Sequence, residues 1–154
     1  MATDVEEAVR QFQTHVGAPT PTWPELSDED KQCLVALAAM LKQASDFFKG
    51  HFKAHNKQID LRCELILEEL GETFMAMAMD DKEATLDGLV DTVYVVVGTA
   101  TQFGLPFSRA FDLVHASNMT KSSAAARHAG DKGKGPNYVP ANLKQLFIDS
   151  YEHG

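Results

Sequence analysis

The chain has 154 residues, a formal net charge of −8 at pH 7 and two cysteines. This length supports one domain with a hydrophobic core, so we expect a single domain over residues 1–154. The acidic charge argues against a protein that mainly binds a nucleic-acid backbone, and no apolar stretch is long enough for a membrane span. The N-terminus lacks the basic and apolar regions of a signal peptide, and the isolated cysteines are typical of reduced thiols. We therefore expect a cytoplasmic protein whose partners include neither nucleic acid nor a membrane.

Apolar residues at helical spacing predict an all-α fold of about five helices. The first is short, over residues 4–16, and Gly17 ends it. A proline-rich connector follows, in which we expect Trp23 to be a packing anchor. Residues 27–30, Ser-Asp-Glu-Asp, place a hydroxyl cap and acids in a first turn, and they predict an additional long helix over 27–57.

The middle of the chain predicts two long helices joined by a turn. The first is a central helix that Asp60 can cap and that ends near Met79. Charged residues at 80–83 supply the turn and the next cap, and an almost wholly apolar helix follows over 86–100. The segment 93–97 has strong β propensity, but an isolated strand would have no partner elsewhere in the chain. We therefore predict that it is helical as well.

The last part of the chain predicts one more helix, which Pro106 opens at its first turn, and a basic loop over 129–140. Glycines in this loop allow close backbone approach, and Lys132 and Lys134 can meet phosphate oxygens. The alternative interpretation is a mobile loop whose lysines are solvated. A short closing helix is expected near 143–147.

Acidic residues gather on one face of the central helix. At about 100° per residue, four of them fall within an arc of about 140°: Glu64, Glu68, Glu69 and Glu72. Asp87 and Asp91 lie one turn apart in the apolar helix, where a carboxylate is costly to ionise unless a cation or strong donors compensate it. Facing helices that each offer stacked carboxylates make an oxygen-rich cage suited to Mg²⁺ or Mn²⁺. The alternative, a solvated acidic surface, explains the aspartate pair poorly.

The run 68–72, Glu-Glu-x-x-Glu, followed by an acidic pair that ends in Asp91, resembles the signature of the all-α nucleoside triphosphate pyrophosphohydrolases. This group includes MazG-type enzymes, dimeric dUTPases and phosphoribosyl-ATP pyrophosphohydrolases. Four segments resemble the small MazG-related proteins of phages and bacteria: 12–17, 87–100, 114–121 and 132–138. One position departs, because the wider group has a glutamate where this chain has Gly88; Asp87 is the obvious substitute.

The resemblance implies a MazG-like helical bundle that works as a homodimer or homotetramer, with active sites in four-helix bundles. It implies metal-dependent hydrolysis of a nucleoside triphosphate to monophosphate and pyrophosphate, with Mg²⁺ or Mn²⁺ as cofactor. Glu68 is the implied residue that orients or deprotonates the attacking water. The implied metal ligands are Glu69, Glu72, Asp87 and Asp91. The implied substrate contacts are Asn118, Lys121, Lys132, Lys134, Tyr138 and Gln13.

The resemblance leaves the base open, with dGTP, dUTP and dCTP as candidates in nucleotide-pool control. A phosphoribosyl-ATP substrate is less favoured, because the run Ser-Asn-Met-Thr-Lys at 117–121 does not belong to that branch. A second hypothesis is a non-catalytic helical sensor that binds nucleotide or metal, and Gly88 is its best support. A third is a structural bundle with acidic faces. Release of pyrophosphate separates the first hypothesis from the other two.

Overall fold

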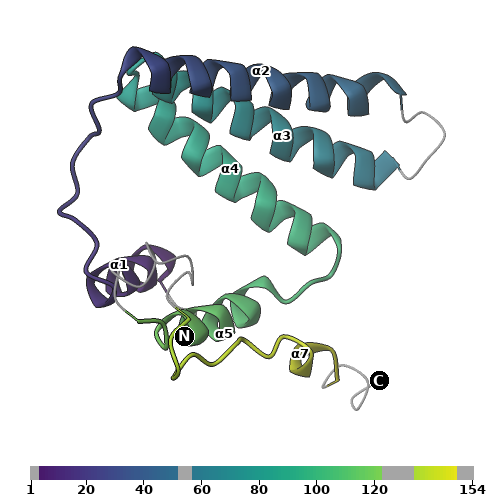
Figure 1. Ribbon diagram of the computed structural model, residues 1–154. Helices are drawn as coiled ribbons and strands as arrows, with labels where there is room; N and C mark the ends of the chain where they lie inside the picture. Colours follow the sequence, from purple (N-terminus) through teal and green to yellow (C-terminus); the bar gives the residue numbers. More distant parts are fainter. Residues whose placement is uncertain (1–3, 52–56, 123–133, 149–154) are drawn as a thin grey trace. The chain divides into compact units, whose positions relative to one another are not determined.

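A computed structural model describes residues 4–51, 57–122 and 134–148 (Figure 1). Every regular element in this part of the chain is a helix, which confirms the predicted all-α fold. The chain forms two compact units. One consists of Trp23–Gly104, and the other combines Met1–Thr22 with Leu105–Gly154. Each unit is described by itself.

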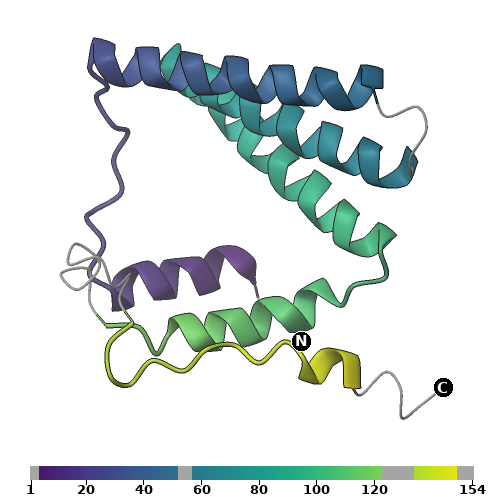
Figure 2. The same cartoon turned by 45° about the vertical axis from the view of Figure 1, so that its right-hand side comes forward.

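The first unit contains three long helices: α2 (Asp28–His51), α3 (Lys57–Ala78) and α4 (Lys82–Gln102). The central helix, α3, packs along both α2 and α4 (Figures 1 and 2). The predicted cap of α2 is confirmed: Ser27 Oγ accepts a hydrogen bond from the Asp30 backbone N–H at 3.1 Å. In return, the Asp30 carboxylate accepts from the Ser27 N–H at 3.1 Å, and the hydrogen bonds from Ser27 lower the pKa of Asp30.

The start of α3 differs from the prediction. Asp60 does not cap this helix, because α3 already begins at Lys57 and Asp60 lies within its first turn. An acid there still interacts favourably with the positive end of the helix dipole, so the sequence signal was correct but its position was shifted by one turn. The predicted long helix over 27–57 is confirmed as far as His51, and residues 52–56 lie outside the described part of the chain.

The turn between α3 and α4 follows the prediction. Asp80 has a positive φ of 59°, and the Asp81 carboxylate caps α4 by accepting from the Ala84 N–H at 3.0 Å. Trp23 donates its indole N–H to Asp80, and its ring lies 5.5 Å from Lys82 Nζ. The tryptophan therefore anchors the connector to the turn, as expected.

The apolar segment 93–97 is helical, as predicted, within a continuous α4. Two hydroxyls of this helix are satisfied by its own backbone, because Thr99 donates to the Val95 carbonyl and Thr101 donates to the Val97 carbonyl. The helix ends at Gln102 with Phe103 as its cap, and Gly104 follows with a φ of 68°, in the left-handed region that favours glycine.

The second unit contains α1 (Val5–His15), α5 (Phe107–Asn118) and α7 (Gln145–Ile148). The Asp4 carboxylate caps α1, and α5 begins directly after Pro106, as predicted. Helix α1 packs against α5. None of the described helices is by itself long and apolar enough to cross a membrane, whereas α4 and α5 taken together pass that test by length and composition alone.

Gly88 allows α3 and α4 to approach closely. A Cβ atom at this position would lie 2.5 Å from Thr73 Oγ1 and 3.1 Å from Thr73 Cα, closer than real Cβ contacts allow. Thr73 itself is fixed, because its side chain is buried and its hydroxyl donates to the Glu69 carbonyl at 2.7 Å. The wider group has glutamate where this chain has Gly88, and this contact leaves no room for that side chain.

We predict that Gly88→Ala destabilises the protein, although alanine is the better helix former by about 1 kcal/mol. Overpacking at a tight contact costs about 1–3 kcal/mol and should outweigh that gain. Gly98→Ala is the matched control on the same helix, because its Cβ would lie 3.6 Å from Arg62 Nη1, an ordinary contact. Urea unfolding should show a lower free energy of unfolding for Gly88→Ala and no decrease for Gly98→Ala. Equal stability of the two variants would contradict the close approach.

Candidate functional site

The contact between Thr73 and Gly88 sets which acids face one another. Glu69 lies one turn before Thr73 on α3, and Asp91 lies about one turn after Gly88 on α4. Because a short turn joins the two helices and they run in opposite directions, these two carboxylates lie at the same level of the seam between α3 and α4. The seam is therefore the candidate metal site.

Electrostatics shows that the predicted acids gather around Glu69. Its pKa is raised above the ordinary value of 4.5, first because burial disfavours its charge and then because four neighbouring carboxylates repel it. In order of effect, these neighbours are Asp91, Glu72, Glu68 and Asp87. They are the remaining four residues of the predicted catalytic and metal-binding set. Asp87 has the smallest effect of the four on the pKa of Glu69.

The carboxylates are close enough to repel one another, but they do not form a closed cage. Within residues 4–51, 57–122 and 134–148, no three Asp, Glu, His or Cys side chains converge as ready-made metal ligands. Like charges without a cation spread apart, so an open arrangement is expected. The donor set is made of carboxylate oxygens and has unrelieved negative charge, which fits Mg²⁺ or Mn²⁺ and does not suit a softer metal.

Glu68 has a partner that the sequence did not suggest. Lys49 of α2 donates to Glu68 Oε1 at 2.7 Å and lies 3.7 Å from Glu64 Oε1. The hydrogen bond with Glu68 is the first cause of the raised pKa of Lys49. Lys49 therefore holds Glu68 on the side of α3 that faces α2, apart from the seam with α4. No local pattern could have revealed this ion pair, because it depends on how α2 packs against α3.

Arg62 is a second basic residue that sequence analysis missed. Its guanidinium lies next to Gly98 of α4, and its buried Nε has no hydrogen-bond partner among the described residues. Arg62 lies two helical turns before Glu69, on the same side of α3. A guanidinium whose Nε has no hydrogen-bond partner among the described residues therefore lies on the side of α3 that carries Glu69.

Most of the predicted substrate-binding residues lie in the other unit. Lys121 Nζ is 5.7 Å from the ring centre of Phe12, which precedes the exposed Gln13 on α1, and the backbone carbonyl of Lys121 lies 2.8 Å from His15 Nε2. Asn118 is the last residue of α5.

The end of α5 also contacts the segment that starts at Lys134. Lys134 Nζ lies 5.2 Å from the ring centre of Tyr138. Ser117 Oγ donates to the Val139 carbonyl at 2.7 Å, and the Val139 N–H donates to Thr120 Oγ1 at 2.9 Å. The structure therefore brings the end of α5 together with α1 and with residues 134–139. Lys132 lies outside the described residues.

The described part of the chain is all-α, and its predicted acids lie on two helices that pack against each other. The phosphoribosyl-ATP pyrophosphohydrolase family matches residues 34–118, which is just over half of the chain and includes all five acids of the predicted catalytic and metal-binding set. The chain belongs to this family, within the MazG-like nucleoside triphosphate pyrophosphohydrolases. Membership indicates a pyrophosphohydrolase that acts on nucleotide triphosphates. No curated protein and no solved structure gives a significant match.

We predict that Glu69→Gln stabilises the metal-free protein at neutral pH. Because folding raises the pKa of Glu69, its contribution to stability is fully present below pH 4.5 and is lost as the pH rises through the raised pKa. Glutamine removes this loss. Thermal unfolding in chelator should therefore give a higher Tm for the variant at pH 7, and the gap should narrow on acidification.

Glu25→Gln, in the exposed connector before α2, is the control and should leave the Tm nearly unchanged. A Glu69→Gln protein that is less stable than wild type at pH 7, or a gap that widens on acidification, would contradict the repulsion around Glu69.

Proposed function

We propose that the protein is an Mg²⁺- or Mn²⁺-dependent pyrophosphohydrolase that converts a nucleoside triphosphate to the monophosphate and pyrophosphate. The observation that carries this proposal is the convergence of the predicted acids around Glu69, on the α3–α4 seam. The family match supports the reaction class. The proposed role is nucleotide-pool control, with dGTP, dUTP and dCTP as candidate substrates.

In this proposal four carboxylates hold the metal: Glu69, Glu72, Asp87 and Asp91. When bound, the divalent ion neutralises triphosphate charge and lowers the pKa of water at the site. Glu68 orients the attacking water and accepts its proton, and Lys49 fixes the Glu68 carboxylate through their 2.7 Å hydrogen bond. The water oxygen forms a bond to the α-phosphorus as the bond from that phosphorus to the leaving pyrophosphate breaks.

The leaving pyrophosphate gains negative charge and needs cations. Arg62 is placed along the seam to meet it, because its Nε has no partner among the described side chains. Further contacts to the substrate are proposed from the second unit and the basic loop: Asn118, Lys121, Lys132, Lys134, Tyr138 and Gln13. Their role rests on the sequence resemblance.

The sensor hypothesis was favoured by the missing glutamate at position 88. The structure offers a packing reason for that glycine, since any side chain there would collide with Thr73. The departure therefore does not by itself argue for lost catalysis, and the hydrolase is the better-supported function.

The activity is tested by incubating the purified protein with Mg²⁺ and each common nucleoside triphosphate and separating the products by anion exchange. We predict monophosphate and pyrophosphate from wild type and a loss of at least about 100-fold in kcat/KM for Asp91→Ala, because removing one charged ligand disrupts stabilisation of the transition state. Glu83→Ala, on the first turn of the same helix, should retain nearly full activity. Full activity of Asp91→Ala, or tight nucleotide binding without turnover, would reject the hydrolase.

We also propose that the protein is a homodimer or homotetramer, in which a second copy completes a four-helix bundle over the acids. Helix α4 leaves a stripe of apolar side chains exposed on its side away from α3: Leu86 (65% exposed), Val90 (57%), Val93 (56%) and Tyr94 (79%). A stripe of this kind on a helix next to the active-site acids is typical of an interface.

We predict that Val90→Arg breaks this assembly and lowers activity at least about tenfold, because an unpaired charge cannot be buried in an apolar interface. Light scattering coupled to size-exclusion chromatography measures the mass, and circular dichroism checks the fold. Val9→Arg, at an exposed valine of α1, is the control. A Val90→Arg protein with the wild-type mass and activity would remove α4 from the interface.

A further inference from the structure

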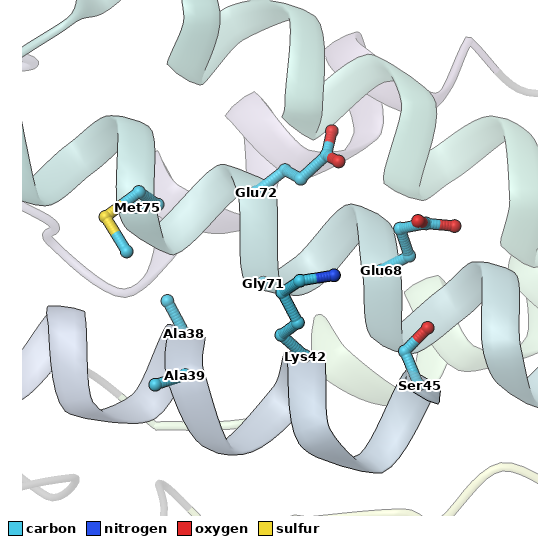
Figure 3. A pocket seen from close by; sticks show the side chains of 8 residues that line it. All are labelled: Ala38, Ala39, Lys42, Ser45, Glu68, Gly71, Glu72 and Met75. Atoms are coloured by element: carbon cyan, nitrogen blue, oxygen red, sulfur yellow. The ribbon is translucent and has the colours of Figure 1, made fainter. Parts of the chain in front are cut away.

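A cavity of about 300 Å³ lies between α2 and α3, beside the acids (Figure 3). Its walls are mostly small or apolar: Ala38, Ala39, Gly71 and Met75. Four polar side chains complete the lining: Lys42, Ser45, Glu68 and Glu72. Its volume lies at the lower end of the range for small-molecule sites, and mostly apolar walls with a few polar groups are typical of such sites.

Ser45 is the unusual residue of this cavity. The residue is only 1% exposed, and its hydroxyl has no hydrogen-bond partner among the described residues. Two other buried hydroxyls of this unit, those of Thr73 on α3 and Thr85 on α4, each donate to the backbone carbonyl four residues earlier. Thr92 on α4 also has a buried hydroxyl without a partner among the described residues, but it does not line the cavity. A buried hydroxyl without a partner is costly, and a ligand in the cavity would satisfy it.

The cavity and the acids share residues. Glu72 is a proposed metal ligand and also lines the cavity, and Glu68, the proposed base, does the same. A nucleotide whose α-phosphate lies at these carboxylates would therefore extend its sugar and base toward the cavity. The occupant that fits is a flat heterocycle, which packs against alanine and glycine and against the thioether of Met75.

We propose that this cavity binds the nucleobase of the substrate, and that Ser45 and Lys42 select a base with a keto oxygen at the edge opposite the sugar. The proposal rests on the proposed function. The Lys42 ammonium only donates hydrogen bonds, and the Ser45 hydroxyl can donate as well. Figure 3 shows both side chains pointing from α2 toward α3. Two donors match the O6 of guanine or the O4 of uracil and thymine, and they mismatch the amino groups of adenine and cytosine.

Lys42 is available for this role. Its contact with Asp46 is 3.5 Å long and both side chains are more than half exposed, so the ion pair is weak and its ammonium can turn into the cavity. Ser45 lies three residues further along α2, on the same side of the helix. The two donors therefore face one region of the cavity.

The selectivity test compares kcat/KM for dGTP and dUTP with that for dATP and dCTP. Wild type should favour the keto bases by at least about tenfold, and Ser45→Ala should reduce this ratio about fivefold, mainly through KM, as expected for one lost hydrogen bond. Lys42→Met should reduce it further. Unchanged ratios in both variants, or a wild-type preference for dATP or dCTP, would overturn the inference. A Gln13→Ala variant that alone changes the ratio would also do so, because it would assign base recognition to α1.

A second test fills the cavity with a larger side chain at an exposed residue of its lining. Ala39→Phe should raise KM for all substrates at least about tenfold, whereas Ala36→Phe, one turn earlier on α2 and outside the lining, should not. An equal change in KM for the two variants would argue that the substrate does not bind in the cavity.

A binding measurement separates this inference from the proposed function. Calorimetry without metal, with the uncharged deoxynucleosides of guanine, uracil, adenine and cytosine as probes, should show the same keto preference and the same loss of affinity in Ser45→Ala. If no triphosphate is hydrolysed but this binding pattern holds, the proposed function fails and the base site stands. If triphosphates are hydrolysed but the probes bind without base selectivity, the proposed function stands and the base site fails.

Discussion

The close contact between Thr73 and Gly88 is the constraint on which the site depends. An interior glycine weakens a helix by about 0.5–1 kcal/mol relative to alanine, yet only glycine fits where α4 meets the buried Thr73. The contact fixes the register of α3 against α4 and so brings Glu69 level with Asp91. It also explains why the usual acid of the wider group is missing at position 88, and it makes Asp87 the remaining candidate for its role.

The acids of the candidate site lower the stability of the fold. Burial and four like charges raise the pKa of Glu69, so the acids destabilise one another, and the proposed divalent cation would relieve this repulsion. Lys49 limits this cost by pairing with Glu64 and Glu68 on the other side of α3. The acids therefore form two groups. Glu64 and Glu68 pair with Lys49, whereas the remaining acids have no ion pair among the described residues. Carboxylates left in this condition are typical of functional sites.

The sequence was sufficient for the elements, and it singled out the acids that raise the pKa of Glu69, whose roles stay predictions. Caps such as Ser27 and Asp81 are local signals, and the helical spacing of the glutamates needs no tertiary information. The Asp60 cap was misplaced, because an acid in a first turn and an acid at a cap leave similar sequence patterns. The Lys49–Glu68 pair and the cavity at Ser45 could not be predicted, because both arise only when α2 packs against α3. The residues near the end of α5 remain predictions from resemblance.

The most direct test of the central claim is the position of attack. Hydrolysis of a nucleoside triphosphate in ¹⁸O-labelled water with Mg²⁺, followed by mass spectrometry of both products, shows which phosphorus receives the water oxygen. Attack at the α-phosphorus, which we predict, places the label in the nucleoside monophosphate and leaves pyrophosphate unlabelled. Label in pyrophosphate would mean attack at the β-phosphorus, and label in free phosphate with a nucleoside diphosphate product would mean attack at the γ-phosphorus. Either result would contradict the proposed mechanism.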